Sequence, residues 1–346
     1  MAHLDWALVL VVATVLLYDF TNGFHDAADM VATAIASRAM APATAILLVT
    51  AATFIAPFMV GLAVADTVGT FVSIEGAGRL VGEAVVVAAL LAAVSYNLGT
   101  WWLGYPSSSS NSLAGGLIGA GLQAVGAGKI HWGLAALADG RLEGAAKVVA
   151  GLLFSPAFGF LAGFLLMRLL VRLLRPFRYK VERLLVFSQY GSVAWLGFSH
   201  GANDAQKGMA VIGMMLLAGG HTSHFMVPDW AVVLCASAIT LGTLFGGWRI
   251  IRTLGFGIYR LRVLHAVANQ LGAALVNSLA TAIGAPTSTT QVVTATLVGN
   301  GAAEKPRHVR WRTVGGILAG WWLNIPLSMV MGYAYAALYL QLRQAP

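Results

Sequence analysis

Two short stretches of the chain carry acids and amides in the spacing of one helical face. In "NGFHDAAD", Asn22, Asp26 and Asp29 follow one another at intervals of four and three residues, which places them on one side of a helix. A later stretch, "SHGANDAQKG", repeats the pattern, and its candidate residues are His200, Asn203, Asp204 and Lys207. Carboxylate and amide oxygens are the ligands that Na⁺ or a proton would use. The sequence therefore predicts a cation site along these two stripes.

Two runs of hydroxyl residues offer a different chemistry. Each follows a Gly-x-Pro break, and the runs are Ser107, Ser108, Ser109 and Ser110, followed by Asn111, and Thr287, Ser288, Thr289 and Thr290, followed by Gln291. Proline followed by Ser or Thr indicates a helix N-terminus, where backbone N–H groups and hydroxyls together bind an anion without arginine. We therefore expect an anion site at two helix ends. For both motif pairs the alternative is structural: a helix-packing network for the acids and N-caps for the hydroxyls.

The elements that must position these residues are membrane helices. The chain has 346 residues, of which 58% are hydrophobic and only 10% charged, whereas a soluble domain averages about a quarter charged residues. Apolar runs of about 20 residues recur, each long enough to cross a bilayer. The predicted spans are 6–37, 43–65, 83–103, 111–127, 148–171, 190–218, 230–248, 263–283, 291–303 and 313–341.

The two halves of the chain resemble each other. Asp26 and Asp204 are 178 residues apart, and Pro106 and Pro286 are 180 apart. Five crossings per half would insert the second copy upside down, which is typical of a secondary transporter with a site at the membrane midplane. The predicted fold is an all-α polytopic membrane protein of two inverted repeats, 1–175 and 189–346, joined by a short basic linker at 176–188.

Basic residues gather in the loops between apolar segments. The clusters lie at 168–183, 249–262 and 304–312, and the positive-inside rule makes such loops cytoplasmic. With ten crossings, both termini are then predicted to lie outside. The same rule explains the net charge of +8 without a nucleic-acid partner.

Four motifs together indicate a family. The stretches "NGFHDAAD", "FSHGANDAQKG", "YPSSSSNS" and "PTSTTQV" resemble the signatures of the inorganic phosphate transporter (PiT) family, especially its low-affinity bacterial branch, across nearly the whole chain. The resemblance implies a symporter that carries phosphate, free or as a metal–phosphate complex, with H⁺ or Na⁺ by alternating access. It also implies re-entrant helical hairpins whose tips bind phosphate, a homodimer among the lipids of the bacterial cytoplasmic membrane, and no cofactor beyond the co-transported ion. Asp26 and Asp204 match the family's paired acids.

The sequence departs from the family pattern in residues that bear on the coupling ion. Asp29 stands where the family usually has Asn, and Asn111 and Gln291 follow the hydroxyl runs where His or Thr is usual. Asp29 aligns with Lys207 across the repeat, so we expect the two to form an ion pair near the pseudo-two-fold axis. The Lys207 ammonium would then replace one Na⁺ and shift coupling toward protons, or the pair would only hold the repeats together.

Other functions fit these residues less well. A sulfate or other oxyanion permease of the same fold is the nearest alternative, although acids favour phosphate, because monoprotonated phosphate can donate a hydrogen bond and sulfate cannot. A membrane enzyme with a serine nucleophile and His25 or His200 as base would need one unique constellation, whereas the motifs occur twice. A channel would not need buried acids and broken helices, which favour coupled binding.

Overall fold

The computed structural model describes residues 5–104, 107–177, 181–246, 251, 255 and 257–344. Within these residues the regular structure is helical, and the β pairing consists of an isolated bridge between Val72 and Ile130. The helices are α1 (Trp6–Ala36), α2 (Pro42–Ile55), α3 (Ala63–Thr70), α4 (Arg79–Leu103), α5 (Ser109–Ala124), α6 (Leu134–Ala138), α7 (Gly144–Leu174), α8 (Val181–Ala218), α9 (Asp229–Phe245), α11 (Val263–Ala282), α12 (Thr289–Glu304) and α13 (Trp311–Gln344). The predicted all-α fold is confirmed. The Gly-x-Pro break at Pro106 lies outside the described residues, and residues 181–188 of the predicted linker belong to α8.

Helix length distinguishes the helices that could cross a membrane from those that are too short to do so. By length and hydropathy, α1, α4, α7, α11 and α13 could each cross a membrane. Helices α5 and α12 have 16 residues each and α9 has 17, fewer than the roughly 20 that a bilayer requires. The predicted span at 43–65 is broken by a sharp bend, because α2 with its terminal 3₁₀ turn makes an angle of 74° with α3. Pro57 lies in that turn, and proline cannot continue the hydrogen-bond ladder of a helix.

The two halves of the chain are interlocked. Helix α1 packs against α9, and α8 packs against α2, so the first helix of each half contacts the second helix of the other. An added Cβ on Gly23 would overlap the carbonyl of Ile239, and one on Gly201 would overlap the carbonyl of Thr53. Gly23 and Gly201 occupy equivalent positions in the two acidic stretches. The same small residue therefore allows the same close helix contact twice.

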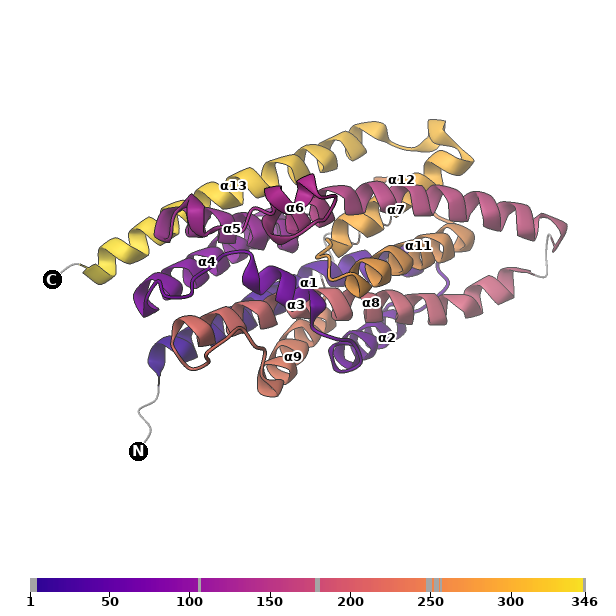
Figure 1. The fold of residues 1–346 in the computed structure, drawn as a ribbon. Helices are drawn as coiled ribbons and strands as arrows, with labels where there is room; N and C mark the ends of the chain where they lie inside the picture. The colour runs from indigo at the N-terminus through magenta and orange to yellow at the C-terminus, as the bar shows by residue number, and fades with distance from the viewer. Residues whose placement is uncertain are drawn as a thin grey trace.

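Two helical hairpins bring the hydroxyl runs together. Helices α4 and α5 lie toward the end that holds the termini, and α11 and α12 lie toward the opposite end (Figure 1). Helix α5 packs against α13 and α12 packs against α7, so the last helix of each half covers the hairpin of the other. The hairpin tips meet in the interior, where Ser110 Oγ donates a hydrogen bond to the carbonyl of Thr287 at 2.9 Å. This crossed arrangement is the one that inverted repeats predict.

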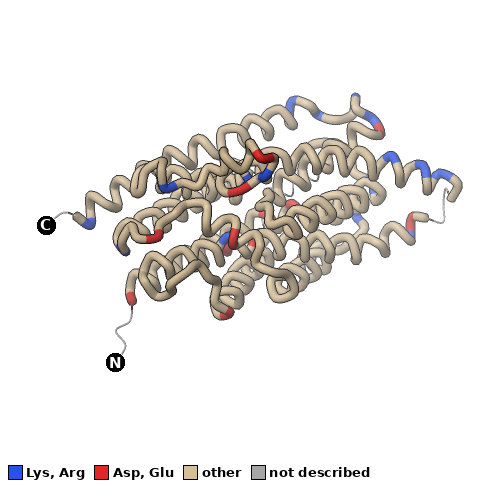
Figure 2. The backbone as a smooth tube through the Cα atoms, viewed as in Figure 1, with Lys and Arg blue, Asp and Glu red and all other residues tan. Residues whose placement is uncertain are grey.

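Side chains are distributed as in a membrane protein. Phe154, Phe158, Leu161 and Leu165 form an exposed stripe on α7, whereas the acids and hydroxyls of the motifs are buried. Both termini lie at one end of the bundle (Figure 1), and Lys and Arg gather at the other (Figure 2).

Candidate functional site

Each hydroxyl run forms the N-terminal end of a buried helix. Ser108 is the N-cap of α5 and Ser288 is the N-cap of α12, with φ/ψ angles of −109°/111° and −107°/107°. Their hydroxyls accept hydrogen bonds from the backbone N–H groups of Asn111 at 3.0 Å and Gln291 at 3.3 Å. All eight hydroxyl residues are at most 4% exposed. The capping alternative therefore holds for the second residue of each run, and the other three residues make different contacts.

The first hydroxyl of each run holds the turn to its own hairpin. Ser107 Oγ lies 2.7 Å from Thr100 Oγ1 of α4. Thr287 Oγ1 donates to Asn277 Oδ1 of α11 at 3.3 Å, and Thr287 N–H donates to Asn203 Oδ1 at 3.0 Å. Asn203, predicted as a coupling residue, thus positions the second turn.

The third hydroxyl of each run contacts the polar stripe of its own repeat. Ser109 Oγ donates to Asn22 Oδ1 of α1 at 2.5 Å. The equivalent Thr289 Oγ1 lies 3.3 Å from His200 Nδ1 and donates to Asp204 Oδ2 at 2.6 Å. The first residue of each stripe, Asn22 or its equivalent His200, therefore contacts the turn of its own repeat.

The fourth hydroxyl of each run contacts the stripe of the opposite repeat. Thr290 Oγ1 lies 2.7 Å from Asp26 Oδ1 and 2.6 Å from Asp29 Oδ2. On the other side of the pseudo-two-fold axis, Ser110 Oγ accepts a hydrogen bond from Lys207. These crossed contacts join the two repeats at the centre of the protein.

Lys207 is a buried cation whose partner is not the predicted one. Its side chain pairs with Asp204, one turn earlier on α8, and donates to the carbonyl of Thr287 at 2.7 Å. The expected ion pair with Asp29 is therefore wrong. The symmetry axis relates the two positions without bringing them together, because each reaches the hydroxyl turn of the opposite repeat. The acid closest to Lys207 is the one on its own helix face.

Two groups of buried side chains have the geometry to hold a cation. One is Asp26, His200 and Asp204, the other is His25, Asp26 and Asp29, and within each group the potential ligand atoms lie within 4.8 Å of one another. His200 Nδ1 lies 2.9 Å from Asp204 Oδ2 and 3.8 Å from Asp26 Oδ2. The structure thus links the two acids that the sequence selects. The carboxylate oxygens suit Na⁺ or a proton. The sequence pattern predicted His200 as part of the second stripe, whereas His25 lies outside the predicted stripes.

The residues after the hydroxyl runs present unused acceptors. Asn111 Oδ1 and Gln291 Oε1 are buried and have no hydrogen-bond partner among the described residues. Buried acceptors without donors are costly. Both are therefore available to a cation or to a hydroxyl of a bound anion.

Three asparagines that support the turns were not identified from the sequence. Asn97 on α4 accepts from Ser112 Oγ at 3.1 Å, and Asn277 is its equivalent on α11, 180 residues later. Asn324 on α13 donates to the carbonyl of Ser108 at 2.7 Å. The repeat offset is the signal that could have identified the first two, whereas the sequence carries no such signal for Asn324.

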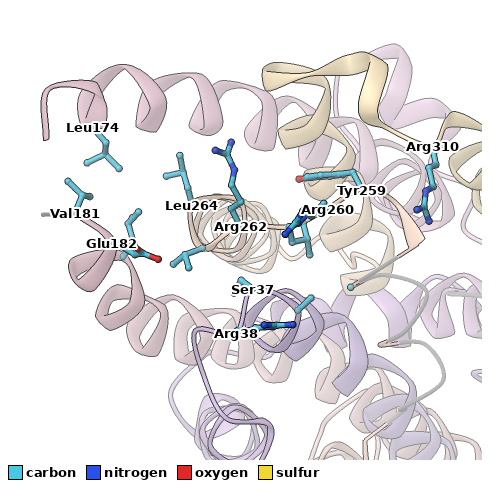
Figure 3. Close-up of a pocket in the computed structure, with 15 residues that line it drawn as sticks. Ser37, Arg38, Leu174, Val181, Glu182, Tyr259, Arg260, Arg262, Leu264 and Arg310 are labelled. Carbon is cyan, nitrogen blue, oxygen red and sulfur yellow. The ribbon is translucent and has the colours of Figure 1, made fainter. Parts of the chain in front are cut away.

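The turns are closed to a substrate in this structure. A cavity of about 10 Å³ borders Ser110, Lys207 and Pro286, which is room for about one water molecule. A separate open pocket of about 750 Å³ lies around α11 and the ends of α1 and α7; its lining includes Arg38, Glu182, Arg260, Arg262 and Arg310 (Figure 3). The hydroxyl turns are therefore reached only after the helices move.

Comparisons with known proteins agree with this geometry. Residues 22–332 match the Phosphate transporter family. The chain is 37% identical over 326 residues to a "Probable low-affinity inorganic phosphate transporter" of Rhizobium meliloti (strain 1021), and 34% identical over 326 residues to one of Bacillus subtilis (strain 168), with 94% of each chain covered in both cases. A solved structure described as "The sodium-dependent phosphate transporter" superposes with a TM-score of 0.82 at 21% identity, covering 97% of this chain and 99% of that one. That likeness shows a shared fold.

Proposed function

The chain belongs to the phosphate transporter family, and we propose that it takes up inorganic phosphate together with H⁺ or Na⁺ as a secondary symporter. Its family and relatives are transporters, which removes the membrane-enzyme alternative. The observation that carries the proposal is the charge balance around the hydroxyl turns. Three buried acids at these turns face a single buried ammonium within the described residues; the acids are Asp26, Asp29 and Asp204, and the ammonium is that of Lys207. An anion entering this site needs added positive charge, which a co-transported cation supplies.

Shared hydrogen-bond donors supply a physical basis for coupling. Thr289 and Thr290 donate to carboxylates of the two stripes. A phosphate between the two helix N-termini would draw the same hydroxyls and the adjacent backbone N–H groups, since charged acceptors bind such donors strongly. The carboxylates would then lose their donors, and an uncompensated buried carboxylate is costly. Binding of H⁺ or Na⁺ to these acids restores the balance, so that phosphate and cation bind together.

The two sides of the site differ in fixed charge, which favours one of them for the cation. On the α8 side, the Lys207 ammonium already neutralises Asp204. On the α1 side, Asp26 and Asp29 share the single hydroxyl of Thr290. We therefore assign the coupling cation to this acid pair, with Asp26 as its central ligand. On the α8 side, the Lys207 ammonium supplies this positive charge as a fixed part of the protein.

The acids also favour phosphate over sulfate. At neutral pH phosphate retains a proton that it can donate to Asp26 or Asp204, or to the free carbonyl of Gln291. Fully ionised sulfate has no proton to donate and would face the carboxylates with two negative charges. A sulfate permease remains the alternative function, and competition experiments separate the two.

The charge distribution favours one orientation in the membrane. The end rich in Lys and Arg (Figure 2) would be cytoplasmic by the positive-inside rule, which leaves both termini outside. The arginine-lined pocket (Figure 3) would then open to the cytoplasm, where its positive charge attracts phosphate. The bacterial sources of the relatives support the cytoplasmic membrane as the location.

Reconstitution into proteoliposomes tests this function. Phosphate uptake would be measured with an inward pH gradient, with an inward Na⁺ gradient, and with neither. Symport predicts accumulation above equilibrium with at least one gradient, inhibited by arsenate and little affected by sulfate. Phosphate uptake that stops at equilibrium under every gradient would contradict symport. Equal accumulation of sulfate would favour the alternative permease.

A further inference from the structure

Asp19 is a buried acid that the transport site described above does not use. Its side chain is 0% exposed, and neither carboxylate oxygen has a hydrogen-bond partner among the described residues. The other two acids of α1 differ, since Asp26 and Asp29 both accept the hydroxyl of Thr290. Asp19 lies one helical turn before Asn22, the first residue of the acidic stripe.

The surroundings of Asp19 are close-packed. An added Cβ on Gly208 of α8 would overlap both carboxylate oxygens, so the carboxyl lies directly against the helix that carries Lys207. The titratable groups that face it are the Cys235 thiol of α9, Asp204 and Lys207 of α8, and Tyr18 on its own helix. The thiol is the nearest possible donor to the carboxyl; it is a weak donor and lies outside hydrogen-bond geometry.

Among the described residues, the ammonium near Asp19 is that of Lys207, and it is paired elsewhere. The Lys207 ammonium pairs with Asp204 and donates to Ser110 and to the carbonyl of Thr287, which uses all three of its N–H groups. A carboxylate without a cation or a strong donor is far more costly to bury than a neutral carboxylic acid. In the closed state shown here, the neutral acid is the form that fits the position.

We propose that Asp19 is a proton-binding site that carries one H⁺ with each phosphate, separately from the cation held by Asp26 and Asp29. This inference rests on the proposed symport. The O–H bond of the Asp19 carboxyl forms with a proton taken from the external water when the site opens outward. The bond breaks by transfer of this proton to water when the site opens to the cytoplasm. No electrons are transferred.

Lys207 supplies a reason for proton release. It precedes Gly208, the residue against which the Asp19 carboxyl lies, so a turn of the lysine side chain away from Asp204 would bring the ammonium toward Asp19. An adjacent ammonium favours the carboxylate and expels the proton. The position equivalent to Asp19 in the second repeat is Gly197, so the repeat does not duplicate this site.

Transport by Asp19→Asn proteoliposomes, compared with the wild type, tests the proposal. Asn has nearly the shape of the protonated acid but cannot release a proton. We expect Asp19→Asn to retain phosphate exchange at equal pH on both sides, to accumulate less phosphate than the wild type under a pH gradient, and to move one proton fewer per phosphate, counted with an internal pH dye. Asp66→Asn, which changes an exposed acid of α3, is the matched control and should keep the wild-type ratio. An unchanged ratio in Asp19→Asn would overturn the proposal. Absence of phosphate exchange in the wild type would instead overturn the proposed function.

Infrared difference spectroscopy provides a readout that does not depend on transport. The purified wild-type protein should show the C=O stretch of a buried protonated carboxyl, and Asp19→Asn should lack it. If Asp19→Asn does not fold, Gly208→Ala serves instead, because its added Cβ displaces the carboxyl and should shift the band. An identical band in the variant that folds would show that Asp19 carries no proton.

Discussion

Asp29 and Lys207 occupy equivalent positions in the two repeats, and each contacts the fourth hydroxyl of the opposite turn. Asp29 accepts from Thr290 at 2.6 Å, and Lys207 donates to Ser110. The backbone arrangement is therefore symmetric while the charge is opposite. A fixed cation on one side and an acid on the other make the two halves of the site chemically different.

Asp204 and Lys207 should be strongly coupled in stability. Lys207→Met leaves the Asp204 carboxylate buried without its ammonium, and breaking such a pair costs about 3–5 kcal/mol. The double variant Lys207→Met/Asp204→Asn should recover much of that loss in thermal unfolding. Lys207→Met combined with Asp29→Asn should show additive losses, and strong coupling between those two residues would contradict the contacts described here.

Thr290→Val should weaken phosphate transport. The variant keeps the side-chain shape but removes a donor to charged groups, which contributes about 1.5–3 kcal/mol. We therefore expect an apparent affinity about ten- to a hundredfold lower. Thr296→Val is the control on the same helix, because its hydroxyl donates only to the carbonyl of Val292. Similar kinetics for the two variants would remove Thr290 from the site.

Ser108→Ala and Ser288→Ala should act mainly on stability. Both hydroxyls are N-caps, and losing a serine cap costs about 1 kcal/mol. Each variant should lower the unfolding temperature while changing the apparent affinity less than Ser110→Ala does. A loss of affinity as large as that of Ser110→Ala, with no change in the unfolding temperature, would show that these hydroxyls also contact phosphate.

Asp5 should contribute a pH-dependent part of the stability. It caps α1 ahead of the membrane-spanning segment, and hydrogen bonds from His221, the Leu8 backbone N–H and Arg79 lower its pKa from 3.8 to about 2. Because the folded pKa is the lower one, the contribution is present above about pH 4 and is lost as pH falls toward 2. The unfolding temperature of Asp5→Asn should lie below that of the wild type at neutral pH and approach it across this window. A constant difference would contradict this.

The sequence predicted the elements of this fold better than the contacts among them. Periodicity and the repeat offset placed Asp26 and Asp204 together, because residues on equivalent helices of an inverted repeat approach the same axis. The same reasoning failed for Asp29 and Lys207, since the offset reports which positions are equivalent but not how far apart they lie. The position of Asn324 depends on tertiary packing, which no local pattern encodes, whereas Pro57 is a local signal for the bend between α2 and α3. The linker boundaries at 176–188, the homodimer and the metal–phosphate complex stay predictions.

The most direct test of coupling through shared hydroxyls is to ask whether a phosphate gradient drives H⁺ or Na⁺ across the membrane. Vesicles with reconstituted protein would receive an inward phosphate gradient with no initial pH or Na⁺ gradient, while internal pH and Na⁺ are recorded together with phosphate. We expect H⁺ or Na⁺ to enter in a fixed ratio to phosphate, and Asp26→Asn to lower that ratio or stop transport. Phosphate entry with neither ion moving would contradict coupled binding at the two turns.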